Sequence, residues 1–348
     1  MKRKYFKTFK IDDDNFEPFV EMIVGENKSI NIDGRGGTGK STLIGQLQNA
    51  MNEKDLKYVT LAPSNKAARL IKGDTIHKFI KKHPARIMKE VNLDYIIIDE
   101  ISMVHEMFYK YFLTIKKIKP NLKFIIAGNF DQLLPVKDRA EFEYQDSVAL
   151  YDLRDGLKLN LTKCRRADDI CFNKCSPENI PKIKKSEFEH KFTARHLSYT
   201  NQTRKHINKK MMDELVATKK GKKSLSLDKL HYDGNSQDVR LLARTPIIAR
   251  VNKADMDIYN NECYIIKEIQ HSKANILIVD EFGDTKDIPF YEFQKLFYVA
   301  YCITIHRSQG STFDHPYTIH EWDHPNFNNR LKYVAMSRTT KLENINII

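Results

Sequence analysis

A glycine-rich run near the N-terminus carries the residue types that bind a nucleoside triphosphate. Residues 34–41 read Gly-Arg-Gly-Gly-Thr-Gly-Lys-Ser, which fits the pattern Gly-x-x-x-x-Gly-Lys-Ser. Glycines let backbone N–H groups point at phosphate, Lys40 can reach the β- and γ-phosphate oxygens, and the hydroxyl of Ser41 can ligate Mg²⁺. The pattern therefore predicts a nucleotide site.

Three further polar residues follow two apolar runs and could act on the same nucleotide. Asp99 and Glu100 come directly after the run 96–98. An aspartate there can hold Mg²⁺ through its water shell, and the adjacent glutamate can orient or deprotonate the attacking water. Gln132 follows the apolar run 124–127. Its amide could hydrogen-bond a γ-phosphate and its water.

The elements that must position these groups alternate between strands and helices. Apolar runs predict strands at 29–32, 57–62, 95–98 and 124–127, and a helix at 65–71 has a capping serine at position 64. Such alternation predicts an α/β fold with a parallel sheet covered on both faces, and ligands bind at the carboxyl ends of its strands. We expect one domain at 1–155 and a second at 156–348, with a small β insertion near 263–297.

Composition suggests a polyanionic partner. The 348 residues include 58 Lys and Arg against 45 Asp and Glu, a formal net charge of +13. Neutralisation of phosphates by Lys and Arg dominates nucleic-acid affinity, although charge alone does not separate this interpretation from a solubility effect. The sequence predicts a soluble, intracellular protein, because it has no long apolar run and an odd number of cysteines, five. The cytoplasm is the first expectation, with the nucleus and a viral replication site as alternatives.

Taken together, the motifs resemble those of superfamily 1 helicases, and most closely the branch that holds the RecD, Pif and Dda types. They occur in the family's order along nearly the whole chain, at 34–41, 62–68, 75–79, 99–103, 128–136, 161–166, 199–201, 304–312 (Thr-Ile-His-Arg-Ser-Gln-Gly-Ser-Thr) and 333–338. The resemblance implies two tandem RecA-like domains with reduced accessory insertions, and ATP hydrolysis between them.

The resemblance also implies a role for individual residues of the ATP site. The catalytic set would be Lys40, Glu100, Gln132, Arg166 and Arg338, with both arginines supplied by the second domain. Contacts to ATP would come from Gly36, Gly37, Thr38, Gly39, Lys40, Ser41, Thr42, Asp99 and Gly310. Mg²⁺ would be held by Ser41 and Asp99. An arginine that reaches the γ-phosphate only on closure would tie hydrolysis to domain movement.

A second set matches positions that family members place along a single nucleic-acid strand. These are Pro63, Ser64, Asn65, Thr75, His77, Asn201, Thr304 and His306. Hydroxyl, amide and imidazole groups bind sugar-phosphate oxygens without reading the base sequence. The resemblance implies DNA in preference to RNA and movement from 5′ to 3′. We expect a monomer, with no membrane partner and with protein partners unspecified.

The chain departs from the family pattern in two places. No glutamine precedes Gln46, so the expected adenine reader is missing, and Asn15 lies near its place. The segment between His77 and Tyr95 is short where larger relatives insert a strand-separating pin. A translocase that unwinds little by itself is therefore an alternative to a full helicase.

Two alternatives belong to other classes of protein. Residues 252–255, Asn-Lys-Ala-Asp, imitate the guanine-reading motif of nucleotide switches, but the Asp-x-x-Gly at 280–283 follows it, the reverse of the usual order. A nucleic-acid binding module without activity is the second. It is disfavoured because every expected catalytic position is filled.

Overall fold

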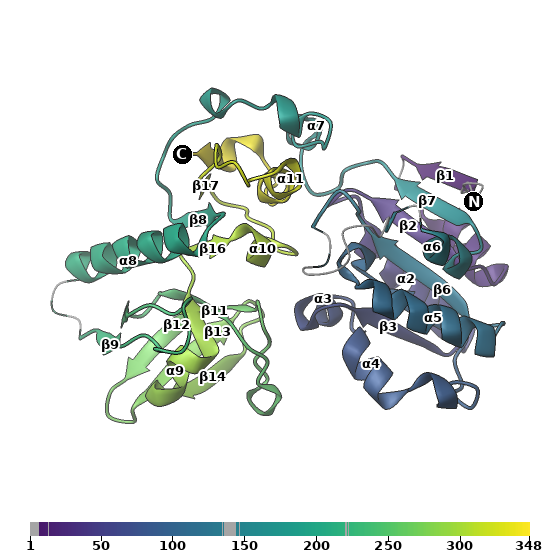
Figure 1. Cartoon of the computed structure of the whole chain (residues 1–348), viewed down its shortest axis with the longest axis horizontal. Helices are drawn as coiled ribbons and strands as arrows, with labels where there is room; N and C mark the ends of the chain where they lie inside the picture. Colours follow the sequence, from purple (N-terminus) through teal and green to yellow (C-terminus); the bar gives the residue numbers. More distant parts are fainter. Residues whose placement is uncertain are drawn as a thin grey trace. The chain divides into compact units, whose positions relative to one another are not determined.

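The computed structural model describes residues 7–12, 14–133, 135, 144–145, 147–219, 221 and 223–348. Leu134 and Val136 of the motif at 128–136 lie outside the described residues. The chain forms two units, Met1–Pro177 and Glu178–Ile348 (Figure 1). In the part of the chain that the structure describes, every helix is too short or too polar to span a bilayer.

The first unit is built on one parallel sheet of seven strands. Their order is β1-β7-β2-β6-β5-β3-β4, and every neighbouring pair runs parallel. The strands are β1 (Lys7–Ile11), β2 (Ile30–Gly34), β3 (Tyr58–Ala62), β4 (Asp74–Thr75), β5 (Tyr95–Ile98), β6 (Lys123–Gly128) and β7 (Leu157–Leu161).

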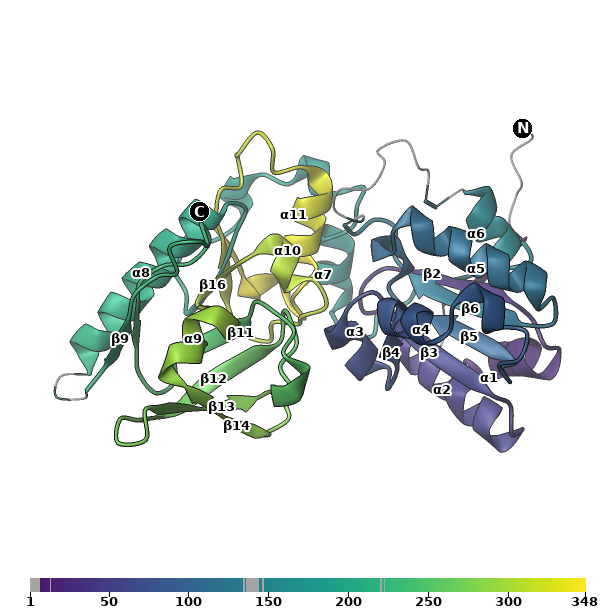
Figure 2. The ribbon, with the colours of Figure 1, turned by 60° about the horizontal axis from the view of Figure 1, so that its bottom comes forward.

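Helices cover both faces of this sheet. They are α1 (Glu17–Val20), α2 (Lys40–Glu53), α3 (Asn65–Leu70), α4 (Ile76–Lys82), α5 (Glu106–Ile118) and α6 (Val148–Leu153). The last helix of the unit, α7 (Asp169–Lys174), follows β7, and its Phe172 contacts Arg35. Figure 2 shows α1 and α2 on one side of the central strands and α5 and α6 on the other. Side chains of a strand alternate between faces. In β5, Tyr95 and Ile97 pack with the α2 core, whereas Ile96 and Ile98 pack with the α5 core.

Three strands of this sheet were not predicted. One of them places the boundary between the two units later in the chain than expected. The predicted strands correspond to β2, β3, β5 and β6, whereas β1, β4 and β7 were missed. Residues 157–161 form β7, which pairs with both β1 and β2. The expected boundary near residue 155 therefore falls before a strand of the first sheet, and the first unit extends to Pro177.

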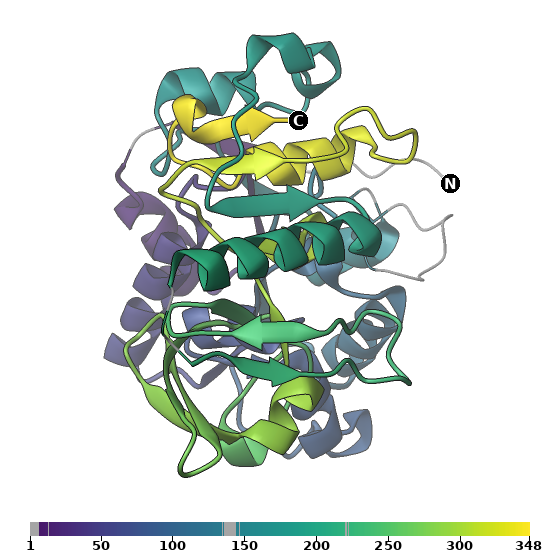
Figure 3. The same ribbon diagram turned by 90° about the vertical axis from the view of Figure 1, so that its left-hand side faces the viewer.

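The second unit contains a parallel sheet and an antiparallel sheet. The parallel sheet has the order β16-β8-β17-β18. Its strands are β8 (Arg195–Ser198), β16 (Cys302–Thr304), β17 (Tyr317–Ile319) and β18 (Ile345–Ile347), and its helices are α8 (Asn201–Thr218), α10 (Ile305–Ser308) and α11 (Asn329–Met336). Figure 3 shows α8 between this sheet and the hairpin of β9 (Leu225–Leu227) and β10 (Val239–Leu241). Lys220 and Lys222, near the end of α8, lie outside the described residues.

The antiparallel sheet includes most of the segment expected to be a small β insertion. Its order is β14-β13-β12-β11-β15. The strands are β11 (Pro246–Ala249), β12 (Cys263–Gln270), β13 (Asn275–Asp280), β14 (Thr285–Pro289) and β15 (Phe297–Val299), with α9 (Phe290–Leu296) before the last. Two residues after β15 the chain enters β16, so this sheet directly precedes the motif at 304–312.

Two glycines of the first unit test this packing. A Cβ at Gly73 would lie 2.2 Å from the carbonyl oxygen of Thr60, whereas one at Gly45 in α2 would meet nothing within 4 Å. We expect Gly73→Ala to lower the free energy of unfolding by about 1–3 kcal/mol, because the backbone of β3 must move. The control Gly45→Ala should raise it by about 0.5–1 kcal/mol. Urea unfolding measures both. Equal effects would contradict the packing described.

Candidate functional site

The glycine-rich loop joins the buried strand β2 to helix α2. Gly37 and Gly39 have φ angles of +87° and +93°, a region that residues with a Cβ rarely adopt. Gly39 is the N-cap of α2, so the first backbone N–H groups of the helix face the loop. Leu43, Ile44 and Leu47 bury one side of α2 in the core and fix the direction of its N-terminus. Such an N-terminus favours an anion.

Lys40 is held inside this loop. Its Nζ donates to the carbonyl oxygens of Gly34, at 2.7 Å, and Arg35, at 3.1 Å. Burial lowers the pKa of Lys40, and the carboxylates of Glu100, Asp99 and Asp33 oppose that shift. The hydroxyl of the fully buried Thr38 donates to the Arg35 carbonyl oxygen at 2.9 Å. The loop is therefore preorganised around an ammonium group.

Asp99 and Glu100 follow β5, at the same edge of the sheet as the loop. Asp99 is only 6% exposed, and burial together with the neighbouring Glu100 raises its pKa to about 7. The backbone N–H of Glu100 donates to Asp99 Oδ1 at 2.8 Å. Glu100 Oε2 is buried, and among the described residues it has no hydrogen-bond partner. A carboxylate oxygen in this condition fits a missing water or cation ligand.

Gln132 is brought to this edge by β6. β6 pairs with β2 and with β5, so the three carboxyl ends are neighbours. Gly128 ends β6, and a Cβ there would lie 2.7 Å from Ile101 Cγ2. This close approach packs the turn after Glu100 against the end of β6. Gln132 follows, is 4% exposed, and its N–H donates to the Asn129 carbonyl oxygen at 3.2 Å.

Arg166 lies on the phosphate-binding loop but comes from the first unit. A Cβ at Gly37 would be 2.7 Å from Arg166 Cβ, and the N–H of Arg165 donates to the Gly37 carbonyl oxygen at 2.8 Å. The expectation that the second domain supplies Arg166 is therefore wrong. The reason is β7, which pairs with β2 and delivers the residues after it to the loop.

Arg165, the residue before Arg166, contacts the loop and the segment before α1. Its Nη1 donates to the Thr38 carbonyl oxygen, and its Nε lies 3.0 Å from Asp14 Oδ1. Its guanidinium stands 4.5 Å from the ring centroid of Phe16. The expected adenine-side residue, Asn15, accepts the N–H of Glu17 at 3.0 Å. The adjacent arginines at 165 and 166 indicate a functional position in the sequence. Only the fold shows which contacts each of them makes.

The residues of the first unit that are expected to contact nucleic acid lie at the carboxyl ends of β3 and β4, the last two strands in the sheet order. β3 and β4 are parallel neighbours, with Ala62 opposite Thr75. Pro63, Ser64 and Asn65 therefore follow β3, while Thr75 ends β4 and His77 lies in the first turn of α4. The hydroxyls of Ser64 and Thr75 accept the N–H groups of Ala67 and Lys78, each at 3.3 Å, and cap α3 and α4. Each hydroxyl can still donate to a phosphate oxygen.

The second unit repeats this arrangement. β8 and β16 are parallel neighbours, with Ser198 opposite Thr304. Asn201 begins α8 after β8, and His306 lies in α10 after β16. Asn201 and His306 are exposed, whereas Thr304 is 8% exposed. The structure therefore brings these three residues to one edge of this sheet.

Glu321 supports that edge, and sequence reasoning missed it. It accepts the N–H groups of Tyr199 and Thr200, each at 2.9 Å, and the hydroxyls of Thr200, at 2.7 Å, and Thr203, at 2.8 Å. These hydrogen bonds lower its pKa against the opposing effect of burial. Glu321 lies over 100 residues from α8 in sequence, so no local pattern points to it.

Arg338 and Gly310 also belong to the second unit. Arg338 is 2% exposed, and it donates to the carbonyl oxygens of Val334, at 2.9 Å, and Ser311, at 3.4 Å. Gly310 has a φ of +77° in the turn after α10. The described contacts of both residues lie within the second unit.

Comparisons with known proteins match both units of the chain. Residues 17–151 match the family model described as an AAA domain, and residues 299–344 match the UvrD-like helicase C-terminal domain. A structure of two coordinating Pif1 helicases unwinding forked double-stranded DNA aligns at 19% identity with a TM-score of 0.69, covering 97% of this chain and 92% of that one. No curated protein sequence matches significantly.

Two further Pif1 structures align over nearly the same extent. Bacteroides Pif1 bound to single-stranded DNA is 19% identical, with a TM-score of 0.68, and covers 96% of this chain and 92% of its own. Candida albicans Pif1 is 16% identical, with a TM-score of 0.68, and covers 97% and 94%. The chain therefore has the α/β fold of two tandem RecA-like domains, as predicted. The structures that share this fold are Pif1 helicases, in line with the resemblance that the sequence motifs indicated.

The raised pKa of Asp99 gives a test of the acidic pair. A carboxyl whose pKa rises on folding from 3.8 to about 7 contributes stability that is present below pH 4 and lost as the pH approaches 7. Asp99→Asn removes this loss. Without nucleotide or Mg²⁺, we expect the urea midpoint of Asp99→Asn to rise relative to that of the wild type as the pH increases from about 5 to about 8.

Asp213→Asn is the matched control, because Asp213 is exposed and pairs with Arg240 on the surface of the second unit. Its midpoint should keep a constant offset from the wild type over the same pH range. An Asp99→Asn offset that did not change with pH would contradict the raised pKa of this buried carboxyl.

Proposed function

We propose that the chain is an ATP-dependent translocase and helicase that moves along single-stranded DNA from 5′ to 3′. The observation that carries this proposal is the buried carboxylate oxygen of Glu100 beside the phosphate-binding loop, at the edge where Lys40, Asp99 and Gln132 also gather. A binding module without activity has no need for such a group. The relatives with this fold include a Pif1 helicase crystallised with ADP-AlF3 and single-stranded DNA.

In this proposal the loop binds the triphosphate through Gly36, Gly37, Thr38, Gly39, Lys40, Ser41 and Thr42. Lys40 moves from the loop carbonyl oxygens, which it now contacts, to the β- and γ-phosphate oxygens. Glu100 accepts a proton from the attacking water, and Gln132 orients that water. Arg166, already on the loop, adds positive charge where negative charge develops. Gly310 is assigned to the nucleotide by its motif.

Ser41 and Asp99 would hold Mg²⁺. Magnesium is usually bound by one or two carboxylates together with substrate phosphates and water, and the donor set here has that composition. When bound, the ion neutralises charge on the β- and γ-phosphates. A cation near Asp99 would also return the pKa of this carboxyl toward its ordinary value, so the buried pair fits the ion.

Arg338 is assigned the role of a cation that the second domain brings to the γ-phosphate, and the support is its match to the family motif. The strand would be held by Pro63, Ser64, Asn65, Thr75 and His77 in the first unit and by Asn201, Thr304 and His306 in the second. Each set lies at the carboxyl ends of two adjacent parallel strands. These groups bind sugar and phosphate, so we expect little dependence on base sequence.

Translocation with little unwinding is a second candidate, and one observation favours it. Between α4 and β5, residues 83–94 form a single 3-10 turn, Ala85–Ile87, and no strand. A pin that separates two strands has no obvious counterpart in these residues.

Substitutions at the loop and the acidic pair test the catalytic assignment. We expect Glu100→Gln to lower the rate of ATP hydrolysis stimulated by single-stranded DNA by about 100- to 10,000-fold, because it removes the general base. Lys40→Ala should abolish the same activity. The exposed Glu90→Gln in the same unit is the control and should keep wild-type turnover. Full activity of Glu100→Gln would remove the assignment.

Strand-displacement assays on tailed duplexes test direction and substrate. Duplexes of DNA and of RNA, each with a 5′ or a 3′ tail, should be separated only when DNA carries a 5′ tail. ATP hydrolysis stimulated by single strands without displacement on any substrate would support the translocase alone. Turnover that is selective for GTP and insensitive to single strands would refute the proposal.

A further inference from the structure

Three arginines of the second unit surround one tyrosine ring. The guanidinium carbons of Arg204, Arg250 and Arg307 lie 4.9, 5.0 and 5.2 Å from the ring centroid of Tyr298. Each distance is within the range of a cation–π interaction. We call these four residues the arginine cage. They come from α8, the end of β11, α10 and β15, so the cage joins both sheets of the unit.

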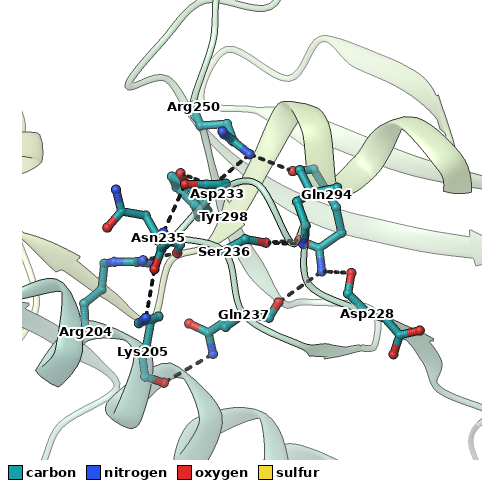
Figure 4. Close-up of polar contacts among 12 residues, drawn as sticks. Arg204, Lys205, Asp228, Asp233, Asn235, Ser236, Gln237, Arg250, Gln294 and Tyr298 are labelled. Atoms are coloured by element: carbon teal, nitrogen blue, oxygen red, sulfur yellow. Dashed lines mark hydrogen bonds and ion pairs between the residues drawn. The ribbon is translucent and has the colours of Figure 1, made fainter.

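The cage holds more positive charge than it neutralises. Asp233 accepts the Tyr298 hydroxyl at 2.7 Å and lies 3.0 Å from Arg250 Nη1 (Figure 4). Within the described residues, this is the only ion pair that the three arginines make. Three guanidiniums and one carboxylate leave a formal charge of +2. An excess of buried charge is costly unless a ligand of opposite charge offsets it.

Burial makes this excess more pronounced. Arg204 is 2% exposed, and its Nη1 has no hydrogen-bond partner among the described residues. Burial lowers the pKa of Arg204 and of Arg307, and in each case a second arginine of the cage adds to the shift. The side chains of Arg250 and Asp233 remain 15% and 11% exposed, so the cage is not sealed from solvent.

The cage contacts one residue that we assign to nucleic-acid binding, Asn201, and adjoins another in sequence, His306. Arg204 Nε donates to Asn201 Oδ1 at 2.9 Å, which leaves the amide NH₂ of Asn201 to face a phosphate. Arg307 follows His306 directly, and its Nη1 donates to the Ala249 carbonyl oxygen at 3.3 Å and to Asn261 Oδ1 at 3.1 Å. Positive charge is therefore concentrated between the start of α8 and α10.

We propose that the arginine cage is a phosphodiester-binding centre for the single strand in the second unit. Arg250 and Arg307 supply the charge that attracts a backbone phosphate, and Arg204 is a positioning residue that orients Asn201. Asp233 limits the attraction so that the phosphate can be released. This inference rests on the proposed function and adds Arg204, Arg250 and Arg307 to the residues assigned there.

Loops around the cage hold it in place. Arg204 Nη2 donates to the Asn235 carbonyl oxygen at 2.6 Å, and Lys205 Nζ donates to that of Gly234 at 3.0 Å. Gln294 Nε2 donates to the carbonyl oxygens of Asp228 and Gln237, each at 3.1 Å (Figure 4). These bonds fix the loop that carries Asp233, so the charges cannot move far apart. A preorganised cluster binds an anion with little further ordering.

A matched pair of arginine substitutions tests the cage. Arg250→Gln removes a cage charge, whereas Arg240→Gln removes an exposed charge of the same unit that pairs with Asp213. Binding of a labelled oligothymidine is measured by fluorescence anisotropy over a series of salt concentrations. We expect Arg250→Gln to weaken binding at least about fivefold at low salt and to reduce the slope of log K against log salt by about 0.7. Arg240→Gln should leave both values near those of the wild type.

A matched pair of aspartate substitutions separates a charge effect from a structural one. We expect Asp233→Asn to strengthen oligothymidine binding, because it removes the carboxylate that offsets the cage, and Asp213→Asn to have little effect. If the cage only maintained the fold, Asp233→Asn and Arg250→Gln would both weaken binding. Opposite shifts in affinity from the two cage variants are thus the decisive result.

The remaining outcomes distinguish this inference from the function on which it rests. Wild-type protein that bound no oligonucleotide would overturn both. Wild-type binding that Arg250→Gln left unchanged would overturn the cage alone. If inorganic phosphate displaced the oligonucleotide far better than chloride at equal ionic strength, and did so equally from Arg250→Gln, the phosphate site would lie elsewhere and the cage would again be refuted.

Discussion

The buried charges of Lys40, Asp99 and Glu100 constrain the whole first unit. Burial lowers the pKa of the lysine and raises that of Asp99, so each group is costly by itself. The attraction of Lys40 to the two carboxylates, the loop carbonyl oxygens and the N–H of Glu100 offset part of this cost, whereas Asp99 and Glu100 repel each other. The arrangement therefore requires a sheet that holds the three groups close together, and it leaves one carboxylate oxygen without a partner.

Parallel pairing meets this requirement because it places the carboxyl ends of neighbouring strands at one edge. β2, β6 and β5 deliver the loop, Gln132 and the acidic pair, and β7 adds Arg165 and Arg166. The second unit has the same arrangement of parallel neighbours in a smaller sheet. There β8 and β16 deliver Asn201 and His306, and the adjoining antiparallel sheet contributes Arg250 and Tyr298.

How far the sequence could predict these sites depends on the length and apolarity of each strand. β5, with four fully buried residues, was predicted at its observed bounds, and β2, β3 and β6 were found within one or two residues. β1 and β7 alternate apolar side chains with lysine, threonine or asparagine, and β4 has two residues. These strands depend on pairing with their neighbours, so their sequences alone give a weak signal. Missing β7 placed the boundary too early and assigned Arg166 to the wrong domain.

The order of motifs along the chain was enough to predict the glycine-rich loop, the acidic pair and the two sets of candidate nucleic-acid contacts, because each prediction depends on residues adjacent in sequence. Tertiary structure decided which arginine contacts the loop, how Glu321 holds the start of α8, and how three guanidiniums meet at Tyr298. Those contacts join residues from separate elements. The spacing of arginines along the sequence does not indicate which residues they contact. Only the packing of the sheets brings these groups within a few ångströms of one another.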